Sequence, residues 1–310
     1  MDQLAALRVF LKVAEKGSFS MAARSLNLSK SAVSKLISAL EDHLGARLFY
    51  RTTRQVSLTE EGRAYVQRAT RILEDLADAD NAVSSLNAEP RGTLRISCAL
   101  DFGLRHVAPA LPEFLGQYPD LKIDVDFNDR FVDLVEEGYD LALRIGSLSD
   151  SSLIARKIAV ARMVVAASPA YLARYGTPLS PADLADHDCL LYRGRNNSGE
   201  WTFTGPDGQS QSVRVSGPMR ANNGDALKET ARHGLGIVAI PDFLLGADLE
   251  QEGLVEILRD YQQALLPVQS IYPPNRHLST KVRRFIDYLA QRFSTRPGWG
   301  NGTDHIVHKS

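Results

Sequence analysis

The part of the sequence that most constrains the fold is a long apolar seam between positions 59 and 89. Two series of apolar residues, each with a spacing of seven and offset by four, form it: Tyr65, Ile72, Ala79 and Leu86, and Ala69, Leu76 and Val83. A seam of about three heptads is typical of helices that pair as a coiled coil. Glu60 and Glu61 suit the start of a helix, and Pro90 ends it. We therefore predict a dimerising linker helix over 59–89 between two domains, the alternative being a helix that lies on its own domain.

Residues 1–58 carry the periodicity of short helices followed by a hairpin. Apolar residues at helical spacing predict three helices, of which Gly17 ends the first and Gly45 the third. Ser18 and Ser29 are suited to cap the second and third. The short, basic and β-branched stretch 46–58 suits a small two-stranded wing.

Residues 18–45 have the anatomy of a helix-turn-helix, because Ala22 and Ala23 allow two helices to cross closely. The second of these helices presents short polar and basic side chains at its N-terminal end, where it could enter the major groove of DNA. The wing adds basic residues that could reach the DNA backbone or the minor groove. The candidate DNA-binding residues are Ser29, Lys30, Ser31, Ser34, Lys35, Arg51, Thr52 and Arg54. On spacing alone, a solvated basic face on an ordinary helical bundle is the alternative.

Charge is distributed unevenly along the 310 residues. Nine basic and four acidic residues give 1–58 a net charge of +5, whereas the whole chain has a formal net charge of −1. A basic module on a mildly acidic body favours a polyanionic partner for one end only.

From Thr93 onward the pattern changes to strands that alternate with helices. Strands are predicted at 94–99, 121–127, 141–145, 163–167, 190–192, 237–240 and 268–272, with helices at 107–118, 226–233 and 281–293. This alternation favours an α/β domain with a mostly parallel sheet. We expect two lobes, about 93–162 with 268–294 and about 163–267, and a disordered tail over 295–310.

The residues of the first 60 positions carry a family resemblance. The run ALRVFLKVAEKGSFSMAARSLNLSKSAVSKLISALEDHLGARLFYRTTRQVSLTEEG resembles the N-terminal module of the LysR-type transcriptional regulators. Farther along, GTLRISCALDFGLRHVAPALPEF, DLALRIG, GLGIVAIPDF and KVRRFIDYL resemble the effector domain of one large branch of that family. The resemblance covers nearly residues 1–293.

The resemblance implies a winged helix-turn-helix over 1–58, a dimerising linker helix over 59–89 and a two-lobed α/β effector domain over 90–294, similar to periplasmic binding proteins. It implies double-stranded promoter DNA as a partner and a small-molecule effector, of unknown identity, in the cleft between the lobes. It also implies a homodimer or homotetramer that bends DNA. The effector would change promoter binding through its different affinities for two arrangements of the protein.

In open α/β sheets, ligands bind at the carboxyl ends of strands. The candidate effector-binding residues at such ends of the first lobe are Ala99, Leu100, Asp101, Phe102, Asn128, Arg144, Ile145 and Gly146, and the candidates in the second lobe are Arg193, Asn222, Asn223 and Ile237. Each of them has a structural or solvent-facing role as its alternative. Asn222 and Asn223 in particular stand before a predicted helix, where either could be only an N-cap.

Two positions depart from the family's pattern. Many members place a hydroxyl or small residue near Asp101 and bind carboxylates at that helix N-terminus. Asp101 would repel an anion or take the dipole site itself, so the hypothesis is that the effector is not a simple carboxylate, or docks elsewhere. Leu36 stands where many members have a polar residue and cannot hydrogen-bond a base, so the preferred half-site is expected to differ.

Other classes of function find little support in the sequence. No P-loop, GxSxG or HExxH motif occurs, and the lone Gly234–Leu235–Gly236 is weak evidence for a nucleotide, so we expect neither an enzyme nor a cofactor. A cytoplasmic solute-binding or enzymatic α/β protein fused to a helical module is the alternative function. No metal site is expected, because His305 and His308 stand in a Gly-rich tail.

Composition and targeting signals agree with a protein that stays inside the cell. Hydrophobic residues make up 44% and charged residues 24%, which is ordinary for a folded domain. Cys98 and Cys189 stand in apolar runs and are expected to be small core residues. With no signal pattern and no apolar stretch long enough to span a bilayer, we expect a cytoplasmic protein without membrane contact.

Overall fold

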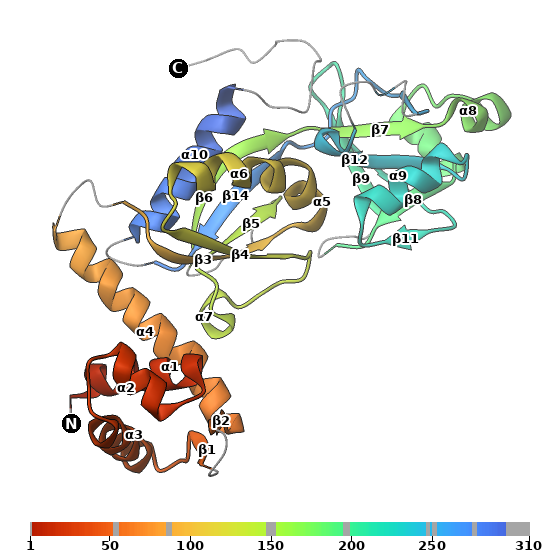
Figure 1. The fold of residues 1–310 in the computed structure, drawn as a ribbon. Helices are drawn as coiled ribbons and strands as arrows, with labels where there is room; N and C mark the ends of the chain where they lie inside the picture. Colours follow the sequence, from red (N-terminus) through yellow and green to blue (C-terminus); the bar gives the residue numbers. More distant parts are fainter. Residues whose placement is uncertain are drawn as a thin grey trace. The chain divides into compact units, whose positions relative to one another are not determined.

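A computed structural model describes residues 2–51, 56–84, 89–146, 153–194, 199–245, 249, 253–274 and 278–295. The chain divides into two compact units, residues 1–88 and 89–310, whose elements are labelled in Figure 1. The predicted disordered tail lies outside the described residues, apart from its first position. Within the described residues, no helix has both the length and the apolar character that crossing a membrane requires.

The first unit begins with the predicted helical bundle. Its helices are α1 (Gln3–Lys16), α2 (Phe19–Ser25) and α3 (Lys30–Leu44). Gly17 and Gly45 end α1 and α3 in the left-handed conformation, and the hydroxyls of Ser18 and Ser29 cap α2 and α3. The predicted ends are therefore confirmed, because each depends on a local signal. Ala22, Ala23, Val33 and Ile37 are buried where the helices meet.

The wing and a long helix follow the bundle. Strands β1 (Phe49–Arg51) and β2 (Val56–Leu58) pair antiparallel, and α4 (Glu60–Ser84) starts directly after them. The hydroxyl of Thr59 accepts a hydrogen bond from the Gly62 N–H (2.9 Å) and donates one to the Arg47 carbonyl (2.7 Å). The start of α4 is thereby tied to the base of the wing.

The structure corrects part of the predicted dimer seam. Ala69 is fully buried within its own unit, and the Tyr65 ring lies 5.3 Å from the Phe10 ring of the same chain. The first turns of α4 complete the core of the bundle, so their apolar side chains are used inside one chain. Ile72 is exposed and Leu76 is partly exposed. The side chains of the remaining seam residues, Ala79, Val83 and Leu86, lie outside the described residues.

The second unit contains two sheets. Among the described residues, the first is five-stranded in the order β4-β3-β5-β14-β6. Its strands are β3 (Gly92–Cys98), β4 (Leu121–Phe127), β5 (Leu141–Ile145), β6 (Ile154–Ala161) and β14 (Leu266–Tyr272). The helical segments that belong to this lobe are α5 (Leu100–Phe102), a π-helical turn (Gly103–Val107), a 3₁₀ turn (Ala108–Ala110), α6 (Leu111–Gln117), α7 (Leu134–Glu137) and α10 (Thr280–Thr295). Phe114 of α6 packs against Phe285 of α10, with ring centroids 5.1 Å apart.

The second sheet is also five-stranded among the described residues, in the order β11-β8-β12-β7-β13. Its strands are β7 (Met163–Ala167), β8 (Cys189–Tyr192), β11 (Arg220–Ala221), β12 (Ile237–Pro241) and β13 (Val255–Glu256), and a separate hairpin consists of β9 (Glu200–Thr204) and β10 (Ser210–Arg214). The helical segments of this lobe are α8 (Pro169–Tyr175), α9 (Gly224–Arg232) and the 3₁₀ turns Pro181–Asp186 and Asp242–Leu244.

The expectation of a mostly parallel sheet is wrong. In the described part of each sheet two pairings are parallel and two are antiparallel. The chain passes from the first sheet to the second between β6 and β7 and returns with β14. These crossing strands enter each sheet in the direction opposite to its neighbours, which the periodicity of single segments does not reveal.

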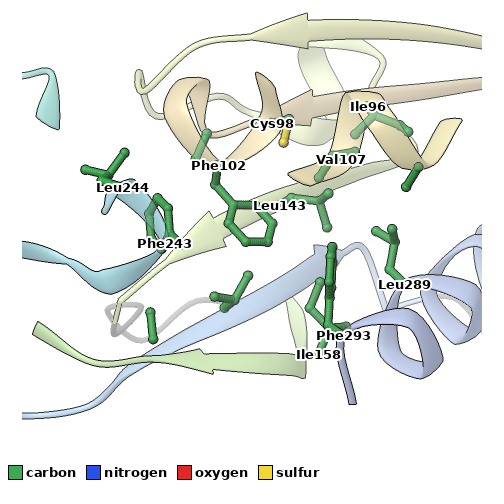
Figure 2. Packing of buried hydrophobic residues seen from close by; sticks show 14 of the residues in the cluster. Ile96, Cys98, Phe102, Val107, Leu143, Ile158, Phe243, Leu244, Leu289 and Phe293 are labelled. Atoms are coloured by element: carbon green, nitrogen blue, oxygen red, sulfur yellow. The ribbon is translucent and has the colours of Figure 1, made fainter. Parts of the chain in front are cut away.

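One hydrophobic core joins the two lobes of the second unit. The Phe102 ring, from the first lobe, lies 5.4 Å from Phe243 of the second lobe and 5.5 Å from Phe293 of α10, as Figure 2 shows. All three side chains are buried, so separating the lobes would expose aromatic surface to water. Cys98 belongs to this core and Cys189 to a second cluster, and burial raises the pKa of each thiol to about 12.

Gly62 provides a test of the junction between the wing and α4. A Cβ atom at this position would lie 2.1 Å from the Leu48 carbonyl oxygen. We predict that Gly62→Ala lowers the stability of the bundle by about 1–3 kcal/mol through overpacking, although alanine is the better helix former. The measurement is amide hydrogen exchange of peptides from α1–α3 over a urea series.

Gly116→Ala in α6 is the matched control, because a Cβ there meets nothing within 4 Å. It should be neutral or slightly stabilising. A Gly62→Ala protein as stable as the control variant would contradict the close packing of α4 on the wing.

Candidate nucleic-acid interface and lobe junction

Helix α3 presents one face to solvent and the other to the core. Lys30, Ser31 and Lys35 are exposed and Ser34 is partly exposed. Val33 and Ile37, on the opposite face, are fully buried. The structure therefore brings together most of the predicted DNA-binding residues of this helix on one accessible surface.

Ser29 also has a local role. Its hydroxyl accepts a hydrogen bond from the Ala32 N–H (3.1 Å) and lies 2.9 Å from the hydroxyl of Ser31. Because one hydroxyl caps the helix and contacts the other, the pair keeps the N-terminal turn of α3 in place. Leu36 requires a correction, since it packs against the core of the bundle and does not stand among the exposed polar residues.

Glu41, which sequence reasoning did not single out as a site residue, positions the wing relative to α3. Its side chain is 3% exposed, and its Oε1 accepts hydrogen bonds from the N–H groups of Leu48 (2.9 Å) and Phe49 (3.2 Å). Arg47 forms an ion pair with the other carboxylate oxygen at 3.4 Å. A buried carboxylate is stable only with such partners. Of the predicted wing residues, Thr52, Arg54 and the side chain of Arg51 lie outside the described residues.

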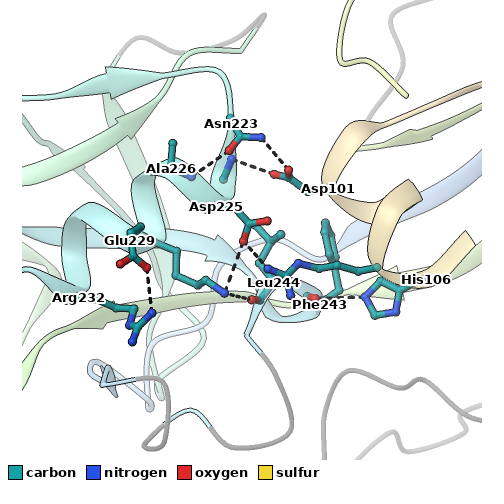
Figure 3. Close-up of polar contacts among 12 residues, drawn as sticks. Asp101, His106, Asn223, Asp225, Ala226, Glu229, Arg232, Phe243 and Leu244 are labelled. Carbon is teal, nitrogen blue, oxygen red and sulfur yellow. Dashed lines mark hydrogen bonds and ion pairs between the residues drawn. The ribbon is translucent and has the colours of Figure 1, made fainter. Parts of the chain in front are cut away.

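In the second unit, the Asp101 side chain of the first lobe forms hydrogen bonds with the second lobe, as Figure 3 shows. Its Oδ1 accepts a hydrogen bond from the Asn223 side-chain amide (2.7 Å), and its Oδ2 accepts one from the Gly224 N–H (3.0 Å). Asn223 is the N-cap of α9, because its Oδ1 accepts from the Ala226 N–H at 2.9 Å. The predicted residues Asp101 and Asn223 are thus in direct contact, and the N-cap role foreseen as an alternative for Asn223 is present.

Two further contacts join the same segments, and we call the whole set the lobe junction. Arg105 donates to Asp225 at 2.6 Å, and the Nε2 of His106 lies 3.2 Å from the Phe243 carbonyl oxygen. Burial lowers the pKa of His106, which keeps the ring neutral near pH 7. The lobe junction therefore consists of residues 101–106 on one side and residues 223–225 with Phe243 on the other.

Asp129 and Tyr192 lie close enough to Asp101 for their charges to interact. Asp129 accepts a hydrogen bond from the Leu100 N–H at 3.0 Å. Burial raises the pKa of Asp129, and the negative charge of Asp101 raises it further. Burial also raises the pKa of Tyr192 to about 12, with contributions from both carboxylates. The charges of the Asp101 and Asp129 carboxylates in the first lobe therefore act on the Tyr192 phenol of the second lobe.

Arg144 lies near the end of β5, where its charge interacts with that of Asp129. Its guanidinium donates to the Ser97 hydroxyl (2.7 Å) and to the carbonyls of Leu143 (3.0 Å) and Arg130 (3.1 Å). Burial lowers its pKa, because none of these three partners carries a charge to offset the cost of desolvation. The buried Oδ1 of Asn128 accepts no hydrogen bond from the described residues.

The other predicted effector-binding residues differ in how far they are exposed to solvent. Phe102 and Ile237 are fully buried in hydrophobic clusters, so they are corrected to packing residues. Phe102 is the last residue of the short helix α5, and Ile237 is the first residue of β12. The remaining ones range from buried Ala99, through partly exposed Leu100, Ile145 and Gly146, to exposed Arg193 and Asn222.

Sequence reasoning missed several residues at or near the lobe junction, including Asp129, Tyr192, Arg105 and Asp225. Asp129 and Tyr192 stand at or directly after predicted strands, so the strand-end rule could have included them. Arg105 and Asp225 are 120 positions apart and carry no local signal for their pairing. Among the described residues, no cluster of three or more His, Cys, Asp or Glu side chains is arranged to hold a metal ion.

Asp242 forms hydrogen bonds with the segment that connects the first sheet to the second. Arg162 stands between β6 and β7, and its N–H donates to Asp242 Oδ1 at 3.1 Å. In return the Asp242 N–H donates to the Arg162 carbonyl at 2.8 Å. Burial raises the pKa of Asp242 to about 6, despite the opposing effect of these hydrogen bonds and of the Arg162 charge.

Comparison with known proteins decides the family. Residues 4–63 match the model of the bacterial regulatory helix-turn-helix protein, lysR family, and residues 87–294 match the LysR substrate binding domain. The chain belongs to the LysR family of transcriptional regulators. As a LysR-family regulator it combines a DNA-binding helix-turn-helix with an effector-binding domain, and proteins of this family bind DNA and small-molecule effectors and oligomerise.

Relatives of this LysR-family chain align over nearly its whole length. An uncharacterized HTH-type transcriptional regulator of Haemophilus influenzae is 45% identical over 282 residues, covering 91% of this chain and 98% of the relative. The solved structure of CrgA, a LysR-type transcriptional regulator from Neisseria meningitidis, has a TM-score of 0.59 at 35% identity and covers 93% of this chain and 98% of its own. AphB, a virulence activator of Vibrio cholerae, has a TM-score of 0.57 at 30% identity with the same coverage.

Asp242 gives a pH-dependent prediction. Because the folded-state pKa is raised to about 6 from 3.8, the folded protein binds the proton more tightly than the unfolded chain. The stability contributed by the protonated acid is present at low pH and is lost as pH rises through about 4 to 6. Asp242→Asn keeps the acceptor oxygen without the charge, so its stability relative to the wild type should increase across that window.

The measurement is the melting temperature of both proteins from pH 4 to pH 7. Asp207→Asn, at an exposed turn between β9 and β10, is the control and should give a difference that does not follow this pH course. A constant difference between Asp242→Asn and the wild type would contradict a raised pKa for Asp242.

Proposed function

We propose that this chain reads promoter DNA with the exposed polar face of α3 and that an effector bound near the lobe junction modulates this binding. The observation that carries the proposal is the accessible face of Lys30, Ser31, Ser34 and Lys35 on a helix whose other face is buried. Hydroxyl and ammonium groups at the N-terminal end of a helix suit DNA phosphates and base edges in the major groove.

Pairing of two chains through α4 would place two such faces on one duplex. Ile72 is 46% exposed, and Leu76 follows it by four residues on the same helix. We propose that these two residues begin the intermolecular seam, and that the resulting dimers, or tetramers built from them, read two half-sites. On this assignment residues 1–58 read DNA, 59–89 pair the chains and 90–294 bind the effector.

The effector would act by binding, without catalysis. Its candidate contacts are the groups near the lobe junction, including Asn128, Arg144, Arg193 and Asn222. A ligand that contacts both lobes changes their relative stability only by the difference in its affinity for the two arrangements. A role at promoters also places the protein in the cytoplasm, where bacterial DNA is found.

Substitutions on α3 test the DNA-reading face. Duplexes are first selected from genomic DNA by repeated rounds of binding to the wild-type chain. Lys30→Ala should weaken binding to all selected duplexes alike and reduce the slope of log affinity against log salt by about one, because one phosphate contact is lost. Ser34→Ala should change the ranking of the duplexes more than the mean affinity.

Lys122→Ala, which removes an exposed lysine from β4 in the other unit, is the matched control and should leave both affinity and slope unchanged. If Lys30→Ala and Ser34→Ala behave like Lys122→Ala, the assignment of α3 as the reading helix is wrong.

A further inference from the structure

The Asp101 carboxylate occupies a position that helices usually offer to external anions. Helix α9 has nine residues, and its first N–H groups have no partner within the helix. Together with the positive end of the helix dipole, such groups favour a negative charge. Here the Gly224 N–H donates to Asp101, and the Asn223 side chain both caps α9 and donates to the same carboxylate.

The start of α9 is closely packed at Gly224. A Cβ atom added to Gly224 would lie 2.3 Å from Cδ1 of Leu244 and 3.2 Å from Oδ2 of Asp101. The start of α9 is thus enclosed by Leu244 on one side and by the carboxylate on the other. An effector carboxylate could bind the Gly224 N–H only after Asp101 had moved away.

The charges around this contact also disfavour an anionic ligand. Asp129 lies near enough for the charge of Asp101 to raise its pKa, and Tyr192 is affected by both acids. Within the junction, the guanidinium of Arg105 is paired with Asp225. An added carboxylate beside Asp101 would therefore meet the charges of two acids, and the effect of the Arg144 charge on Asp129 is smaller than that of Asp101.

We propose that Asp101 is a built-in carboxylate ligand of α9 and determines the specificity of the lobe junction. It excludes effector carboxylates from the start of α9 and favours an effector that presents a hydrogen-bond donor, such as a hydroxyl or ammonium group, to Asp101 and Asp129. This inference rests on the proposed function, in which the junction belongs to the effector site.

Replacing Asp101 and supplying a small carboxylate tests this role. In the full chain, Asp101→Ala removes the carboxylate, so the amides of residues 224–227 should exchange with solvent roughly five- to tenfold faster, the size expected for a charge-assisted hydrogen bond at a helix N-terminus. Acetate, titrated at constant ionic strength against chloride, should slow this exchange again with a saturable dependence. The wild-type chain should show no saturable response to acetate.

Two further variants separate this role from general destabilisation. Asp133→Ala is the matched control, because Asp133 caps α7 within one lobe by accepting from the N–H groups of Val135 and Glu136. It should leave exchange in α9 unchanged, with or without acetate. Asp101→Asn keeps the shape without the charge, so it should speed exchange in α9 less than the alanine variant and should not respond to acetate, because the position remains filled.

Unchanged exchange in α9 for both Asp101 variants, or an equal acetate response in the wild type and Asp101→Ala, would overturn the proposal. If Asp101→Ala does not fold, unchanged exchange in Asp101→Asn alone has the same force. Binding of these proteins to the selected duplexes is scored separately. A wild-type chain that fails to bind DNA refutes the proposed function, whereas a negative acetate result with intact DNA binding refutes only the role of Asp101.

Discussion

The buried carboxylate of Glu41 is the contact on which the geometry of the first unit depends. It lies on α3 and accepts the N–H groups of Leu48 and Phe49, which begin the wing. The carbonyl of the same Leu48 accepts the Thr59 N–H (3.0 Å) and lies directly against Gly62 of α4. Helix α3, the wing and α4 therefore meet at Leu48. Apart from the Glu41 carboxylate, the groups in these contacts belong to the backbone, so the direction of the three elements depends on few side-chain rotamers.

If α3 reads DNA and α4 pairs two chains, as proposed above, this arrangement would set a fixed distance on DNA. If α4 and α3 form one body, pairing two α4 helices also sets the separation of the two reading faces. The spacing of the half-sites is then a property of the fold and not of individual base contacts. The partly buried start of α4 supports this view, since Ala69 and Tyr65 fasten the helix to its own bundle before any partner is reached.

In the second unit, two kinds of contact join the lobes of an effector-binding domain. The aromatic core around Phe102, Phe243 and Phe293 supplies a nonspecific attraction, and the Asp101 contact with α9 supplies a directional one. A hydrophobic core tolerates small shifts, whereas a hydrogen bond of this kind weakens steeply with misalignment. The polar contacts of the junction are therefore the better candidates for sensing a bound effector.

The sequence predicted the features that depend on local signals and missed those that depend on distant pairing. Gly17, Ser18, Ser29 and Gly45 marked helix ends correctly, because caps act within a few residues. The antiparallel strands at the crossings between the lobes and the Arg105–Asp225 pair escaped prediction, since each joins segments far apart in the chain. Phe102 and Ile237, predicted as ligand contacts, are packed in hydrophobic clusters, because the position of a residue near a strand does not show whether its side chain points inward.

The central claim is that this LysR-family chain presents two reading helices to one face of a DNA duplex. Hydroxyl-radical footprinting of the full chain on a selected duplex tests it most directly. The account predicts two protected regions on the same face, separated by about one helical turn, roughly 10 base pairs, or a multiple of it. A single protected region, two regions on opposite faces, or no protection even at low salt would contradict it.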